Sequence, residues 1–234
     1  MRSFRFLHVA AIAAAALAFG GNAIAQIAGA STEWQEGKHY FVIDPAQPTT
    51  TGDKIEVVEV FSYGCPACNA SYPYVDKLKK DLPANAVLTF VPAAFNTAED
   101  WPMFQRAYLT AKALGIADKA HDAMFDAVWK TGDLAIMDKA TNTPKKPAPS
   151  IEDAAKFYAK YGAKEDEFIA TANSFTINTR VKQTDAYIKA TGIEQTPTVI
   201  VNGKYRITVS SAGGDWTKVE ALVLYLIHKE SGGK

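Results

Sequence analysis

The cysteine pair is the feature of this chain best suited to chemistry. The two cysteines among 234 residues stand close together as Cys65-Pro66-Ala67-Cys68. A disulfide stabilises a fold largely by restricting the unfolded chain, and a loop this short restricts it little. The spacing therefore favours a reactive dithiol that gains and loses electrons over a structural crosslink.

Cys65 is predicted to be the attacking thiol and Cys68 the resolving thiol. Pro66 suits the first position of a helix, because its missing N–H leaves no hydrogen bond unmade. The sulfur of Cys65 would then lie exposed at a helix N-terminus, where a thiolate is favoured. The helix end supplies about 0.3–1 kcal/mol, which is less than one pKa unit. A strongly acidic Cys65 needs direct donors as well, and we expect these to be the backbone N–H groups of Ala67 and Cys68.

Metal and haem chemistry fit the pair poorly. A zinc site needs about four ligands, and outside the N-terminal segment the chain offers only His39, His121 and His228, none of them at short spacing. Covalent haem attachment needs a histidine directly after the second cysteine, where Asn69 stands. We expect neither a metal nor a cofactor.

Thr196 and Pro197 are a second candidate for the site. The pair leads directly into an apolar, β-branched run, Thr198-Val199-Ile200-Val201. A cis proline here would leave the backbone of Thr196 free to pair with a substrate strand. The alternative is a proline that merely begins a strand.

Glu59 is a third candidate, as a proton acceptor for Cys68. It lies within the apolar run Ile55–Phe61 that precedes the cysteines. An acid among core residues beneath a dithiol can exchange protons with it. Glu56 and Glu59 point to opposite faces of a strand, so at least one must face a covered side. The alternative is that Glu59 occupies a solvent-facing edge position.

The elements around these residues alternate in a way typical of an α/β sheet. We predict a strand at 55–61, a helix beginning after Cys65, a strand at 87–92, helices from 97 to 182 with a loop at 139–150, a strand at 198–201 and a partner strand at 205–209. Asn202-Gly203 between the last two strands is a hairpin signal. A helix at 218–228 closes the chain, and the helical block is predicted to be an insertion between two halves of the sheet.

The N-terminus resembles a cleaved secretory signal peptide covering residues 1–25. Arg2 and Arg5 precede an apolar stretch at 9–19, and Ala23-Ile24-Ala25 has the small-x-small pattern of a cleavage site. The apolar stretch is about half the length that spans a bilayer as a helix, and a retained anchor is the alternative. With 25 basic and 25 acidic residues, no charge excess points to nucleic acid.

Together these features resemble the DsbA family of periplasmic thiol:disulfide oxidoreductases, members of the thioredoxin superfamily. The resemblance rests on the signal peptide, the segment Phe61–Cys68, the helical insertion, Thr196-Pro197 and Val201–Tyr205, and it spans nearly all of the chain after the signal peptide. It implies a thioredoxin-like domain made of residues 26–96 and 183–234, with an inserted all-helical domain at 97–182.

The resemblance also implies a function. A protein of this family would donate its Cys65–Cys68 disulfide to reduced or unfolded exported proteins in the periplasm, as a monomer. A quinone-linked inner-membrane oxidoreductase of the DsbB type would re-oxidise it. Pro197 would be the cis proline beside the dithiol, and Glu59 would stand in the place of the family's buried acid.

Three residues depart from the best-known oxidases. Ala67 replaces a histidine, which predicts a less acidic Cys65 and a less oxidising disulfide. Thr196 replaces a valine and is commoner in disulfide isomerases. Phe90 replaces a lysine, so Glu59 is expected to be a lone buried carboxylate with a raised pKa. A reductase or isomerase using the same dithiol, and a binding or chaperone module without redox activity, therefore remain alternatives. The 29 residues of 26–54 are too few for the dimerisation domain that isomerases of this type carry.

Overall fold

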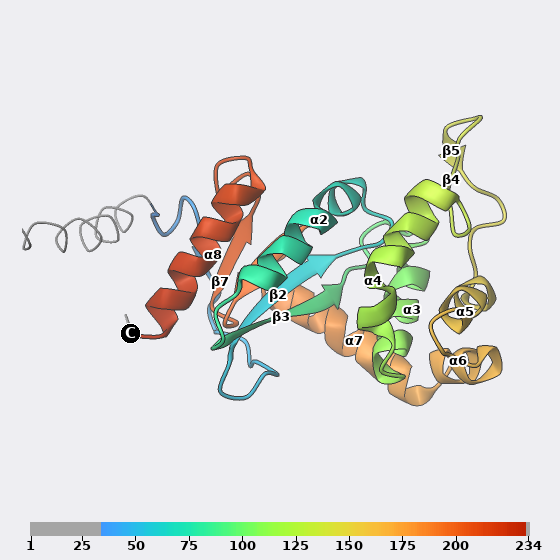
Figure 1. Ribbon diagram of the computed structural model, residues 1–234, viewed down its shortest axis with the longest axis horizontal. Coiled ribbons are helices and arrows are strands. Elements are labelled where there is room, and N and C mark those ends of the chain that lie inside the picture. The colour runs from blue at the N-terminus through green and yellow to red at the C-terminus, as the bar shows by residue number, and fades with distance from the viewer. Residues whose placement is uncertain (1–33, 233–234) are drawn as a thin grey trace, which may run out of the picture. The chain divides into compact units, whose positions relative to one another are not determined.

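The computed structural model describes residues 34–232, and the predicted signal peptide lies outside the described residues. Its strands are β1 (Phe41–Val42), β2 (Ile55–Phe61), β3 (Ala86–Pro92), β4 (Met137–Asp138), β5 (Thr143–Pro144), β6 (Thr198–Val201) and β7 (Tyr205–Thr208). Its helices are α2 (Pro66–Asp81), α3 (Trp101–Ala113), α4 (Ala117–Asp126), the π-helical turn η2 (Ala127–Thr131), α5 (Ile151–Ala159), α6 (Glu165–Ala172), α7 (Phe175–Ala190) and α8 (Trp216–Glu230). Figure 1 shows their arrangement.

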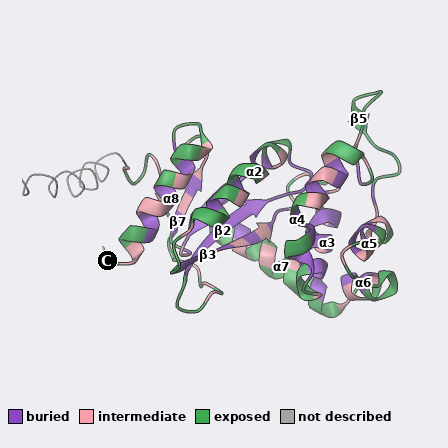
Figure 2. Ribbon diagram, viewed as in Figure 1, coloured by how far each residue is buried: buried purple, intermediate pink, exposed green. Residues whose placement is uncertain are grey.

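The central sheet has five strands in the order β1-β7-β6-β2-β3. β2 and β3 run parallel, whereas β2 and β6, β6 and β7, and β7 and β1 are antiparallel. Every residue of β2 is buried, as its colour in Figure 2 shows. A strand covered on both faces needs apolar side chains throughout, so the two glutamates in β2 stand out.

Helices cover both faces of this sheet. α2 and α8 lie on one face and α7 on the other (Figure 1). α8 places Val219, Leu222, Val223 and Leu226 inward, as the sequence predicts. On the opposite face, a core cluster joins the sheet to the end of α7, and it comprises Ile43, Val58, Val60, Ala93, Ile188, Ile193 and Ile200.

The predicted hairpin between β6 and β7 is confirmed. Asn202 and Gly203 have φ angles of 53° and 65°, and the N–H of Lys204 donates to the Val201 carbonyl at 3.0 Å. Two consecutive positive φ angles are what a tight hairpin requires. A Cβ on Gly203 would collide with the backbone carbonyl of Gln47, so glycine is needed here for space as well.

The segment predicted to be helical contains a hairpin that the sequence did not suggest. The expected loop at 139–150 overlaps a small two-stranded sheet made by β4 and β5, whose turn includes Asn142 at a φ of 53°. The carboxylate of Asp138 stabilises this turn by accepting the N–H of Ala140 at 2.8 Å. The insertion is therefore helical apart from this hairpin.

The domain division at 182/183 remains a prediction, and that position lies inside α7. This helix runs unbroken to Ala190, because no glycine or proline interrupts it before Gly192. Ile177 is buried near one end of α7, while Ile188 joins the core of the sheet at the other. One helix thus contributes to both parts of the fold.

Candidate dithiol active site

The reactive cysteine lies where β2 leads into α2. β2 ends at Phe61, three residues turn the chain, and Cys65 is the N-cap of α2 with Pro66 directly after it. The extended backbone of Cys65 (φ −84°, ψ 118°) turns its sulfur back over the helix, where the N–H of Cys68 donates to it at 3.2 Å. The predicted helix start is confirmed.

Cys65 is more covered than the sequence suggested. Only 4% of its surface is exposed, and Cys68 is fully buried. The prediction of an exposed sulfur is therefore wrong. One neighbour that covers it is remote in sequence, because the sulfur of Cys65 contacts the carbonyl of Thr196 at 3.5 Å.

The helical insertion holds the turn that precedes the dithiol. The indole N–H of Trp129 donates to the carbonyl of Tyr63 at 2.8 Å, and the Tyr63 hydroxyl hydrogen-bonds Nδ1 of His121 at 2.9 Å. Burial lowers the pKa of His121 to about 3, which keeps its ring neutral. A Cβ on Gly64 would lie 2.5 Å from the indole nitrogen of Trp101. Only glycine lets this tryptophan cover the turn.

The surroundings of Cys65 favour its thiolate. The pKa of Cys65 is lowered to about 6, and the largest cause is a hydrogen bond from the Cys68 thiol. Burial opposes this, while the side chain of Thr196 and the backbone N–H groups of Cys68 and Ala67 contribute further hydrogen bonds. The predicted Cys68 donor is thus in place at 3.2 Å, and Ala67 makes the smallest of these contributions. Direct hydrogen bonds supply what a helix end alone cannot.

The pKa of Cys68 moves the other way. Burial raises it well above its usual value, and the hydrogen bond to Cys65, the Cys65 charge and the charge of Glu59 raise it further. One thiol of the pair is thus prepared to ionise and the other to hold its proton, which is the division that thiol exchange requires.

Glu59 is a buried carboxyl that has no cationic partner among the described residues. It is 2% exposed, and its strand lies between β3 and β6, so the edge-position alternative is wrong. Phe90 and Val199 flank it in the sheet register. Among residues 34–232 no hydrogen bond reaches its carboxylate. Burial, and then the charge of Cys65, raise the pKa of Glu59 to about 8, as the lone-carboxylate prediction requires.

Thr196 and Pro197 lie beside the dithiol, and the peptide bond between them is cis, as expected. A groove of about 640 Å³ continues from this pair and from Ala67. An aromatic pair also lines this groove, Tyr74 and Trp216, whose rings stack with centroids 6.5 Å apart. Sequence reasoning missed both aromatic residues, because no local pattern links positions so far apart in the chain.

The part of the chain that the structure describes contains neither a metal-ligand cluster nor a membrane-spanning helix. Within residues 34–232, no cluster of three or more His, Cys, Asp or Glu side chains is arranged to hold a metal ion. Within the same residues, every helix is too short or too polar to cross a bilayer.

The fold and site define a thioredoxin-fold protein with a reactive dithiol and a helical insertion. A sequence model of the thioredoxin family matches residues 52–214. The thiol:disulfide interchange protein DsbA of Pseudomonas aeruginosa is 33% identical over 204 residues, which cover 87% of this chain and 89% of the relative.

Solved structures agree with this assignment. A crystal structure of a variant of Pseudomonas aeruginosa DsbA matches with a TM-score of 0.74 at 33% identity, covering 86% of this chain and all of that one. The oxidoreductase DsbA of Xylella fastidiosa matches with a TM-score of 0.72 at 32% identity, covering 84% of this chain and 97% of that one. The chain belongs to the DsbA family of thiol:disulfide oxidoreductases within the thioredoxin superfamily.

Proposed function

We propose that the protein oxidises the dithiols of exported polypeptides by transferring its Cys65–Cys68 disulfide to them. The observation that carries this proposal is the opposite direction of the two cysteine pKa shifts. With a pKa of about 6, Cys65 is mostly thiolate at pH 7. A stabilised thiolate favours the reduced form of the pair, and a protein that is more stable when reduced is an oxidant.

The exchange takes place in two steps. A substrate thiolate attacks the sulfur of Cys65, so that a substrate–Cys65 disulfide forms, the Cys65–Cys68 bond breaks and Cys68 leaves as a thiolate. A second substrate thiolate then attacks the first substrate sulfur. The substrate disulfide forms, and Cys65 leaves as a thiolate that its hydrogen bonds already stabilise. Two electrons pass from the substrate to the cysteine pair.

Glu59 serves the buried thiol in this scheme. With a pKa of about 8 it is mostly protonated at pH 7, so it can give a proton to the Cys68 thiolate when that thiolate is released. During re-oxidation, Cys68 must lose the same proton before it attacks Cys65, and the Glu59 carboxylate accepts it. A carboxyl held ionised by a lysine would be a weaker base for this task.

The groove beside Cys65 is the proposed substrate site. It adjoins Thr196 and Pro197, so an extended polypeptide lying along it brings its own cysteine to the sulfur of Cys65. The Tyr74–Trp216 pair offers an apolar wall for a neighbouring substrate side chain. Such a groove fits unfolded segments, whose side chains are accessible, better than folded surfaces.

The cellular setting follows from the predicted signal peptide and from the family. We propose that the protein acts in the periplasm as a monomer. Its partner there would be a quinone-linked inner-membrane oxidoreductase of the DsbB type, which returns Cys65 and Cys68 to the disulfide. No nucleic acid enters this scheme.

One observation favours a second candidate, a reductase or isomerase. Thr196 lies against Cys65, whose sulfur contacts the Thr196 carbonyl at 3.5 Å. The Thr196 side chain lowers the pKa of the Cys65 thiol, which a valine could not do, and a hydroxyl at this position is commoner in isomerases. Ala67 also supplies no positive charge beside the thiolate. Both residues bear on the reduction potential, which is the quantity that separates the two candidates.

The test is to equilibrate the protein in graded glutathione buffers and measure the fraction of Cys65–Cys68 disulfide. We expect a reduction potential clearly above that of the glutathione couple, as a disulfide donor requires. A potential at or below that couple would reject the oxidase and support the second candidate. Thr196→Val in the same buffers shows how much of the potential that hydroxyl controls.

A further inference from the structure

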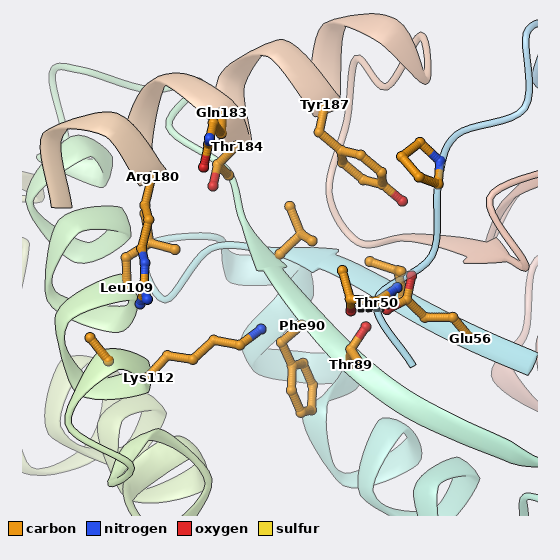
Figure 3. Close-up of a pocket in the computed structure, with 14 residues that line it drawn as sticks. Thr50, Glu56, Thr89, Phe90, Leu109, Lys112, Arg180, Gln183, Thr184 and Tyr187 are labelled. Carbon is orange, nitrogen blue, oxygen red and sulfur yellow. Dashed lines mark hydrogen bonds between the residues drawn. The ribbon is translucent and has the colours of Figure 1, made fainter. Parts of the chain in front are cut away.

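A second pocket lies on the face of the sheet opposite Glu59. β2, β3, α3 and α7 enclose a volume of about 720 Å³ (Figure 3). Glu56 and Val58 of β2 line it, whereas Glu59 faces the other way because successive strand residues alternate. The dithiol mechanism uses none of these lining residues.

Two cations stand together at one end of this pocket. Figure 3 shows the side chains of Lys112 from α3 and Arg180 from α7 on the same side of the cavity. Among residues 34–232, neither lies within ion-pair distance of a carboxylate. Two unneutralised charges that converge on one cavity favour an anionic ligand group.

The opposite end holds the carboxylate of Glu56 and the hydroxyl of Tyr187, so an anionic group is favoured at the cationic end of the pocket and not here. The carboxylate of Glu56 accepts the hydroxyl of Thr50 at 2.5 Å and its N–H at 3.3 Å. Nearby, the hydroxyl oxygen of Tyr187 is buried and has no hydrogen-bond partner within the described part of the chain. An unpartnered buried hydroxyl costs free energy unless a ligand or a water satisfies it.

Apolar side chains also line the pocket. Val58, Val91 and Leu109 come from β2, β3 and α3. An apolar surface with a few convergent polar groups is the usual composition of a small-molecule site. A ligand that matches this arrangement has an anionic head at one end and an apolar body behind it.

We propose that this pocket binds a small amphiphilic carboxylate. Its carboxylate lies between Lys112 and Arg180, where the guanidinium can donate two parallel hydrogen bonds. Its alkyl or aromatic body covers Val58, Val91 and Leu109. A polar group at the far end of a longer ligand meets the hydroxyl of Tyr187.

The test is a two-dimensional ¹H–¹⁵N NMR titration with three probes of equal chain length: octanoate, octan-1-ol and octylamine. We expect octanoate to shift the amides of residues that line the pocket, Val91 and Thr184 among them, and to bind at least fivefold more tightly than octan-1-ol. Octylamine should bind most weakly. Because the head group meets exposed cations, the preference for octanoate should shrink as salt is added.

A matched pair of variants isolates the two charges. Lys112→Gln combined with Arg180→Gln should reduce the octanoate affinity to that of octan-1-ol. Lys145→Gln combined with Lys146→Gln removes the same charge from the exposed loop and should leave the affinity unchanged. Ala113→Trp at the rim should block all three probes if the pocket holds the apolar body.

Three results would overturn the proposal. The first is equal binding of octanoate and octan-1-ol to the unaltered protein. The second is an octanoate affinity that stays the same when Lys112 and Arg180 are both replaced by glutamine. The third is a set of shifted amides centred on Tyr74 and Trp216, which would place the probe in the dithiol groove instead. Since Cys65→Ser should bind octanoate normally, the outcome is independent of the proposed redox function.

Discussion

The two glutamates of β2 have the same side chain and nearly the same burial but very different neighbours. Glu56 is 3% exposed and Glu59 is 2% exposed. Glu56 accepts two hydrogen bonds from Thr50, which ties the segment before the sheet to β2. Glu59 has Phe90 and Val199 beside it in the sheet and the dithiol close by.

This comparison shows that hydrogen-bond donors, more than burial, decide whether a buried carboxyl has a structural or a chemical role. A buried carboxylate with donors keeps its hydrogen bonds and holds the fold together. A buried carboxylate without donors retains its proton to a higher pH, and it can exchange that proton near neutrality. One face of β2 is thus suited to proton and electron transfer, while the other contributes to a pocket.

The largest expected effect is the loss of dithiol oxidation when Cys65 is replaced. Cys65→Ser should reduce the oxidation of a dithiol peptide to the uncatalysed background, because the attacking sulfur is gone. Its thermal midpoint at pH 7 should lie below that of the reduced protein, because serine cannot form the thiolate whose lowered pKa stabilises the reduced fold.

Cys68→Ser is the matched control for that experiment. It keeps the Cys65 thiolate but lacks the resolving thiol. When it is mixed with a peptide that carries a disulfide, the thiolate should attack one peptide sulfur and release the other as a thiolate, so a substrate–Cys65 disulfide should accumulate and be detected by mass spectrometry. Dithiol oxidation that persists in Cys65→Ser would contradict the assignment of Cys65 as nucleophile.

The next largest effect is the change in protein stability with pH that the Glu59 carboxyl causes. The folded pKa of about 8 lies above the unfolded value of 4.5, so folding favours the protonated acid. The stability of the protein relative to Glu59→Gln should therefore be greatest below pH 4.5. It should fall by up to about 5 kcal/mol as the pH rises through 8, at about 1.36 kcal/mol per pKa unit.

Urea unfolding of both reduced proteins at several pH values measures this difference. Cys65 also titrates in this range and its charge raises the pKa of Glu59, so the difference between the two proteins measures Glu59 together with its interaction with Cys65. A difference that does not change between pH 4.5 and about pH 9 would show that Glu59 is not a protonated buried acid.

A smaller effect on the free energy of unfolding is expected when Glu56 loses a hydrogen-bond donor. Thr50→Val removes the hydroxyl donor and leaves a buried carboxylate oxygen less satisfied, which should cost about 1–2 kcal/mol of unfolding free energy. Thr51→Val removes an exposed hydroxyl bond to the carbonyl of Lys54 and should cost less. Dithiol oxidation should be normal in both, and a loss of activity in Thr50→Val would mean that the two faces are coupled.

The smallest effect tests the thiolate environment. Ala67→His places an imidazole, which can carry a positive charge, two residues after Cys65. A charge near a helix end is worth about 0.3–1 kcal/mol. Because about 30 mV corresponds to 1.4 kcal/mol, the reduction potential should rise by about 6–20 mV. Ala70→His, one turn further along α2, should change it less. An unchanged or lower potential in Ala67→His would refute the electrostatic explanation.

Much of the fold could be predicted from local signals. The β-branched run at 55–61, the Cys65-Pro66 helix start, the Asn202-Gly203 turn and the closing helix each depend on residues that are neighbours in the sequence. Their conformations follow from propensities and turn chemistry that act over a few positions. The limits of the helical insertion were harder to place, because the buried face of α7 continues from one part of the fold into the other.

The sequence by itself determined the reactive pair, the order of the elements and the unusual glutamates of β2, since residue type and short spacing decide those features. Only the tertiary structure decided that Cys65 is covered, that His121 and Trp101 hold the turn before it, and that Tyr74 meets Trp216. It also decided which glutamate has donors and which has none. These contacts join residues far apart in the chain, and packing in three dimensions selects such partners where no local pattern records them.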